Sequence, residues 1–233
     1  MEKKKNDFIA QGSILAIASI LVRVMGMIYR IPMTAIIGDK GNGFYSYAYS
    51  VYTILLLLSS YSLPLAVSKM VSAKAQLGQW RNVKRVFICA IAFAIGIGTT
   101  FGLTVLIGAQ FFTRVFFHSE LAAIALRFMA PTILIMALLG VFRGFFQGLQ
   151  NTLPTAVSQI VEGLINAIMS VVFAYFLFDF GHGMDVASGT TDLGYAWGAA
   201  GGAIGTGAGA LAGLIFCFIL FVAYRKILAV NIS

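Results

Sequence analysis

Two arginines, Arg23 and Arg30, lie inside a strongly apolar stretch of the chain, LVRVMGMIYRIPMT. Seven residues make about two helical turns, so both guanidinium groups project from one helix face, roughly 10 Å apart along the axis. A charge at the centre of a bilayer costs about 2.5–3.5 kcal/mol on insertion scales. Both guanidinium groups therefore need a partner, a water-filled cavity or an anionic ligand, and the planar, multi-donor group suits a phosphate.

The arginine face continues in both directions with small and polar residues. Ser19, Gly26 and Thr34 follow Arg23 and Arg30 at steps of three and four residues. We interpret this stripe as one wall of a water-filled, anion-binding cavity, with Arg23, Arg30, Ser19 and Gly26 contacting the bound substrate. The alternative is that the arginines extend to the membrane surface or form structural ion pairs.

A second polar group is expected near the inner side of the membrane. Glu162 and Asn166 lie one turn apart in an apolar segment, and Arg143 lies near the same level at the end of the preceding one. A tight hairpin of the two helices would bring Arg143 and Glu162 together. Two interpretations stay open: an ion pair that clamps the hairpin, or a gate or coupling-ion site formed by Arg143, Glu162 and Asn166.

Three tyrosines, Tyr45, Tyr49 and Tyr52, share one face of the second apolar segment. The first interpretation is an aromatic belt at the outer membrane interface. A surface on which sugars stack is the alternative.

Glycines recur every four residues in the last apolar segment, at Gly201, Gly205, Gly209 and Gly213. Such a ridge is typical of helices that approach each other closely.

The composition indicates the class of protein that must position these groups. The 233 residues are 60% hydrophobic and 10% charged, whereas soluble domains are about 25% charged. The apolar runs are continuous rather than alternating, and several reach the roughly 18–20 residues that cross a bilayer. We predict an all-α, polytopic membrane protein. No zinc spacing, nucleotide loop or nucleophile motif is found, so we expect no metal, no cofactor and no enzyme activity.

Six transmembrane helices are predicted, with Pro32 and Pro64 kinking the first and second. A turn at 39–43, a basic segment at 68–85 and a Gly-rich acidic loop at 179–194 connect some of them. The predicted helices cover about 8–37, 44–67, 86–111, 121–147, 154–178 and 195–224.

The net charge of +8 reflects membrane orientation rather than nucleic-acid binding, because the basic residues are unevenly divided between the two sides. Eleven lie on the side of both termini, two on the other side and three within spans, which predicts that both termini are cytoplasmic. The eleven are Lys3, Lys4, Lys5, Lys69, Lys74, Arg81, Lys84, Arg85, Arg143, Arg225 and Lys226; the two are Lys40 and Arg114; the three are Arg23, Arg30 and Arg127.

Three stretches together resemble a known family: RVMGMIYRIPMTAIIGDKGNGFYSYAY, LPLAVSKMVSAKAQLGQ and RGFFQGLQNTLPTAVSQIVE. They are similar to the multidrug/oligosaccharidyl-lipid/polysaccharide (MOP) flippase superfamily, and within it to Gram-positive lipid II flippases and stage V sporulation protein B-like proteins. The resemblance covers nearly the whole chain up to the last predicted helix.

The resemblance implies a multi-pass transporter of the bacterial cytoplasmic membrane that moves undecaprenyl-pyrophosphate-linked sugar precursors outward for peptidoglycan or other polysaccharides. The family fold has two MATE-like six-helix lobes around a cationic cavity and works by alternating access. Residues 1–233 match the N-terminal lobe, so the expected partners are the lipid-linked anionic oligosaccharide, membrane lipids, and a missing second lobe or another copy.

The resemblance also assigns residue roles, because arginines of the first helix line the cavity in peptidoglycan flippases. The resemblance assigns this role directly to Arg23, which lies in the sequence RVMG. It also assigns the role to Arg30, although the spacing between Arg23 and Arg30 is one residue longer than the corresponding spacing in Gram-negative relatives. The arginine that those relatives place on the second helix has no counterpart here.

Three rival functions make different predictions. A drug/cation antiporter half would place acidic residues in the cavity, where only Glu162 fits. A non-transporting membrane scaffold would use the arginines and the glycine ridge for assembly alone, and would tolerate lysine in place of arginine. A lipid-modifying enzyme would cluster His, Asp or Ser near a membrane face.

Overall fold

A computed structural model describes residues 2–60 and 62–230, with side chains described for residues 12–60 and 62–224. Five of the basic residues that predict the orientation have side chains outside the described part of the chain: Lys3, Lys4, Lys5, Arg225 and Lys226. The helices are α1 (Glu2–Ser59), α2 (Leu63–Gln76), α3 (Trp80–Phe117), α4 (Ala122–Gly148), α5 (Leu153–Ser188) and α6 (Leu193–Val230), and the described residues contain no strand.

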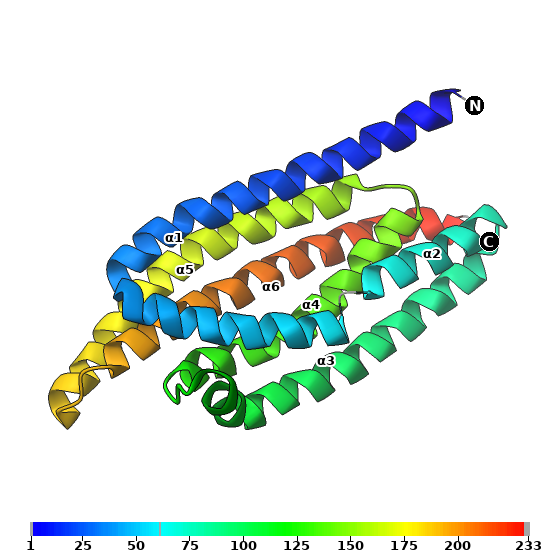
Figure 1. Ribbon diagram of the computed structural model, residues 1–233. Coiled ribbons are helices and arrows are strands. Elements are labelled where there is room, and N and C mark those ends of the chain that lie inside the picture. The colour runs from blue at the N-terminus through cyan, green and yellow to red at the C-terminus, as the bar shows by residue number, and fades with distance from the viewer. Residues whose placement is uncertain (1, 61, 231–233) are drawn as a thin grey trace.

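The helices form an elongated bundle with both termini at the same end (Figure 1). Among the described residues, five helical stretches are long and apolar enough to cross a membrane, and the first, Gly12–Gln76, contains most of α1 together with α2. The predicted class, an all-α multi-pass membrane protein, is confirmed. The count of six spans and the cytoplasmic location of both termini stay predictions.

Helix α1 is broken at Gly38, which separates the two helices predicted at 8–37 and 44–67. Gly38 has φ 65° and ψ 178°, a conformation that glycine adopts without the steric cost of a Cβ atom. The predicted turn over 39–43 is therefore wrong, since those residues are helical and the chain reverses at one glycine. Pro32, predicted to kink the helix, lies within the regular helical segment before the break.

The second half of α1 ends at Ser59, earlier than predicted, and a separate helix follows. Pro64 lies in the first turn of α2, where a missing N–H and a fixed φ cost nothing. Pro64 thus starts a new helix instead of kinking an existing one. The segment 68–85, predicted as a basic connection, is mostly helical, because α2 continues through it and α3 begins at Trp80.

The predicted loop over 179–194 is also wrong, because α5 continues to Ser188 and only four residues connect it to α6. Asp185, which is 5% exposed, accepts hydrogen bonds from the backbone N–H groups of Leu193 (3.0 Å) and Gly194 (2.8 Å). These N–H groups have no partner within their own helix. The Asp185 carboxylate therefore anchors the start of α6 to α5.

The same end of the bundle is tied to the break in α1. Lys40 Nζ lies 2.7 Å from Asp192 Oδ1 in the α5–α6 connection. This ion pair therefore connects the region of the Gly38 break to the short connection, although both side chains are partly exposed and its contribution to stability is small.

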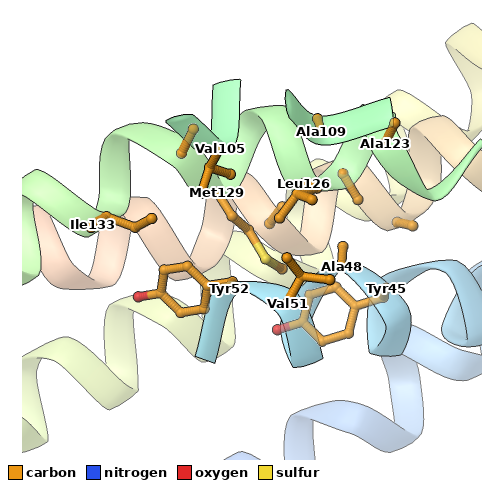
Figure 2. Packing of buried hydrophobic residues seen from close by; sticks show 14 of the residues in the cluster. Tyr45, Ala48, Val51, Tyr52, Val105, Ala109, Ala123, Leu126, Met129 and Ile133 are labelled. Atoms are coloured by element: carbon orange, nitrogen blue, oxygen red, sulfur yellow. The ribbon is translucent and has the colours of Figure 1, made fainter. Parts of the chain in front are cut away.

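Two buried apolar clusters form the core: one is built mainly by the second half of α1, α3 and α4, and the other lies between α2, α3, α4 and α6. Figure 2 shows Tyr45, Val51 and Tyr52 together with Met129 of α4 and other buried residues of α3 and α4. Tyr45 is 1% exposed and Tyr52 is 3% exposed. The prediction that these tyrosines form an interfacial belt is therefore wrong for both of them.

Helix α6 lies between α4 and α5 and packs against both, whereas α4 and α5 make few direct contacts. The expected tight α4–α5 hairpin is therefore wrong. The glycines of α6 explain the close α5–α6 pair, as predicted: a Cβ atom at Gly209 would lie 2.6 Å from the Glu162 carbonyl oxygen, and one at Gly205 would collide with Ser170.

Replacing Gly205 with Ala is expected to destabilise the protein, because the added methyl group collides with Ser170. Overpacking of this kind costs roughly 1–3 kcal/mol, so the midpoint of thermal unfolding in detergent micelles should fall. Gly183→Ala is the matched control, since no heavy atom lies within 4 Å of its Cβ position and alanine favours helix by about 1 kcal/mol. Equal falls for the two variants would contradict the packing argument.

Candidate functional site

A cavity of about 680 Å³ lies between the two halves of α1, α4, α5 and α6. The first half of α1 contributes Arg23, Gly26 and Arg30 to its lining, and α5 contributes Glu162 and Asn166. Residues far apart in the sequence thus meet around one space. The cavity, which we call the main cavity, contains five of the seven residues that the sequence singled out.

The cationic wall of the main cavity consists of Arg23 and Arg30. Both side chains are exposed. In the part of the chain whose side chains the structure describes, neither arginine forms an ion pair, and the three pairs found there involve Lys40, Arg114 and Arg143. Their positive charge is therefore left to solvent or to a ligand.

Ser19, expected beside the arginines, does not line the main cavity. Its hydroxyl donates to the Leu15 carbonyl oxygen (2.9 Å) and lies 3.5 Å from Gln159 Oε1 of α5. Ser19 is therefore placed at the α1–α5 contact.

Hydroxyl groups form another part of the lining. Tyr45, Tyr49 and Tyr52 all line the main cavity, and Tyr45 Oη lies 3.2 Å from Thr206 Oγ1 of α6. The Tyr45 and Tyr49 rings stack with centroids 5.8 Å apart, and Tyr49, at 38% exposed, is the accessible one. Sequence reasoning missed Thr206, although a single hydroxyl residue within GGAIGTGAG was a detectable signal.

The structure brings Arg143 and Glu162 together across α4 and α5. Arg143 Nη2 lies 2.7 Å from Glu162 Oε2, and Arg143 Nε donates to Ser158 Oγ at 2.9 Å. The side chains are only 11% and 24% exposed. Glu162 lines the main cavity and Arg143 does not, so the cavity contains a carboxylate whose charge is already balanced.

Asn166 lines the main cavity one turn after Glu162 and accepts a hydrogen bond from Ser170 Oγ at 2.8 Å. This hydrogen bond fixes the position of the Asn166 amide oxygen. Among the described residues, no group of three or more His, Cys, Asp or Glu side chains is arranged to hold a metal ion.

Reversing one charge of the Arg143–Glu162 pair is expected to destabilise the protein. Arg143→Glu and Glu162→Arg each place two like charges in a largely buried site, and breaking a buried pair typically costs about 3–5 kcal/mol. Each single variant should unfold at a lower temperature in detergent micelles, and the double swap should recover part of the loss.

The control is Arg114→Glu, whose partner Glu120 lies 3.5 Å away with both side chains largely exposed, so little change is expected. Unchanged stability in both single variants of the buried pair would rule out the clamp.

Comparisons with known proteins identify the family. The model of a family described as polysaccharide biosynthesis protein matches residues 8–232. Stage V sporulation protein B of Bacillus subtilis (strain 168) is 26% identical over 228 residues, which are 97% of this chain and 41% of that protein. Lipid II flippase MurJ of the same organism is 26% identical over 200 residues, 82% of this chain and 37% of that protein.

An uncharacterized membrane protein of the same organism, YabM, is 27% identical over 174 residues, 74% of this chain and 32% of that protein. The chain spans about two fifths of the length of the first two relatives. No solved structure matches it. The apolar helices and these relatives establish a multi-pass protein of the cell membrane, and the chain belongs to the polysaccharide biosynthesis protein family within the MOP-type flippases.

Proposed function

We propose that this chain binds the anionic headgroup of a lipid-linked sugar precursor and forms part of a flippase. The substrate would be an undecaprenyl-pyrophosphate-linked sugar, either lipid II or a related polysaccharide intermediate, moved across the cytoplasmic membrane by alternating access. The observation that carries this proposal is the main cavity with two arginines that have no acidic partner among the described side chains.

The chemistry of the main cavity fits a pyrophosphate with attached sugars. Arg23 and Arg30 would donate several charge-assisted hydrogen bonds to phosphate oxygens. The hydroxyl groups of Tyr49 and Thr206 and the exposed ring of Tyr49 suit sugar hydroxyls and sugar faces. The polyprenyl tail would stay in the lipid, beside the apolar outer faces of the helices. Movement requires that the headgroup bind one conformation better than the other.

The remaining wall of the cavity would come from outside this lobe. In the proposed transporter it belongs to a second lobe or to another copy of the chain, and the two sides rock against each other. Membrane potential or an ion gradient would supply the driving force.

The rival functions receive less support from the geometry. An antiporter for cationic drugs needs a free acidic group, and Glu162 is engaged by Arg143 at 2.7 Å. A scaffold would place the arginines against a packing partner, whereas both line an open space among the described residues.

Replacing Arg23 with Ala is expected to slow transport of the lipid-linked precursor by at least about tenfold, because a charge-assisted contact to the headgroup is lost. Transport is measured in proteoliposomes that contain the complete transporter including this lobe. The control is Arg127→Ala, which removes another exposed arginine from an apolar helix but does not line the main cavity. Equal transport by the Arg23→Ala variant and the parent would refute the proposed role.

A lysine variant separates the flippase from the scaffold. Arg23→Lys keeps the charge but loses the planar fork that binds two phosphate oxygens, so transport should fall while assembly is unchanged. Full transport activity of Arg23→Lys would contradict the proposal that the planar guanidinium group, and not charge alone, is needed at this position.

A further inference from the structure

A second, smaller cavity lies beside the main cavity, toward the end of the bundle where α4 turns into α5. Its volume is about 370 Å³, and its polar lining residues are Ser60, Arg143, Gln147, Thr155 and Gln159. Ser60 directly follows α1, and the other residues come from the last turns of α4 and the first turns of α5. We call it the inner cavity, because it lies at the predicted cytoplasmic end.

The two cavities are neighbours. Leu56 of α1 and Met136 of α4 line both of them. The ion pair also spans the boundary, since Arg143 lines the inner cavity and Glu162 lines the main cavity. The Arg143–Glu162 pair and two apolar side chains therefore separate the two spaces.

The inner cavity has the donors that an anion needs. Arg143 carries five N–H groups, of which the structure uses one toward Ser158 and one toward Glu162. The Gln147 and Gln159 amide N–H groups can donate further hydrogen bonds. The Thr155 hydroxyl already donates to the Arg143 carbonyl oxygen (3.4 Å), and the Ser60 hydroxyl lies 3.0 Å from Ser59 Oγ. Thr155 lies in the first turn of α5, where the helix dipole favours negative charge.

We infer that the inner cavity is a second anion site, which receives a phosphate group of the headgroup before the main cavity does, with Glu162 as its built-in competitor. This inference rests on the proposed function and adds a place and an order of binding to it. The Glu162 carboxylate occupies the Arg143 guanidinium in the empty protein. An arriving phosphate, with more oxygens and more charge, displaces it from Arg143.

The position of Glu162 couples the two cavities. Once displaced from Arg143, its carboxylate is an unpaired negative charge in the main cavity, which Arg23 and Arg30 also line. There it repels a second anion or pairs with an arginine, so the two cavities do not fill at the same time. When the phosphate moves into the main cavity, Arg143 is free and Glu162 returns to it. The pair thereby favours stepwise passage of one headgroup.

The test measures binding of inorganic pyrophosphate to the purified chain in detergent micelles by isothermal titration calorimetry. All further substitutions are introduced into the double variant Arg23→Gln/Arg30→Gln, which lacks the cationic wall of the main cavity. Adding Glu162→Gln should strengthen pyrophosphate binding at least about tenfold, because the competitor no longer carries charge. Adding Arg143→Gln as well should abolish the gain. Unchanged binding after Glu162→Gln, or a gain that survives Arg143→Gln, overturns the inference.

A second pair of variants decides the matter without touching the buried ion pair. Leu65 lines the inner cavity and is 75% exposed, so Leu65→Glu and Leu65→Lys should both fold. The glutamate variant should weaken pyrophosphate binding and the lysine variant should strengthen it, each severalfold. Leu77, which is 67% exposed and lines neither cavity, is the control position. Equal responses at Leu65 and Leu77 overturn the inference.

The same titrations separate this inference from the proposed function. If Arg23→Gln/Arg30→Gln binds pyrophosphate as tightly as the parent chain, the main cavity is not the headgroup site and the proposed function fails there. If that double variant binds pyrophosphate weakly and adding Glu162→Gln does not strengthen the binding, the main cavity remains the headgroup site. The inference that the inner cavity is a second anion site is then refuted.

Discussion

Moving a charged side chain from water into an apolar bundle costs several kcal/mol even after the surroundings relax, and this cost governs where polar groups lie in the chain. Glu162 and Arg143 meet at 2.7 Å, so two charges that would be costly alone cancel across α4 and α5. Arg23 and Arg30 have no such acidic partner among the described side chains and line a cavity instead. Neutralisation of Glu162 leaves the main cavity cationic, which is the property that the proposed headgroup binding needs.

Close helix approach makes this arrangement possible. Glycines on α6 bring the backbone of α5 so near that a Cβ atom at Gly209 would lie 2.7 Å from Asn166 Cβ. Gly144 and Gly148 of α4 bring α2 equally close, where a Cβ atom would meet Pro64 and Val71. Dispersion attraction grows with such contact, and it replaces the hydrophobic driving force that lipid surroundings weaken. Both cavities remain where side chains of α1, α4 and α5 do not fill the space between the closely packed pairs.

The two halves of α1 serve different purposes. The first half presents its arginines to the main cavity and an apolar face outward, with Ile28 61% and Ile31 74% exposed. The second half packs into the core through Ala48, Val51 and Tyr52 (Figure 2). Gly38 allows the reversal between them, and the exposed Lys40–Asp192 ion pair lies between the reversal and the α5–α6 connection. One glycine with positive φ therefore sets the angle between the cationic wall and the tyrosines that face the same space.

The sequence by itself determined the helical membrane class, the arginine stripe and the glycine ridge, because hydropathy and helical periodicity are local properties that neighbouring residues fix. Only the tertiary structure decided that the chain reverses at Gly38 rather than over 39–43, that Pro64 starts a helix, and that α5 runs to Ser188. It also decided that Tyr45 and Tyr52 are buried, and that Arg143 and Glu162 meet although α6 keeps α4 and α5 apart. These features depend on which helix faces which, and residues far apart in the chain supply the contacts that choose between locally equivalent alternatives.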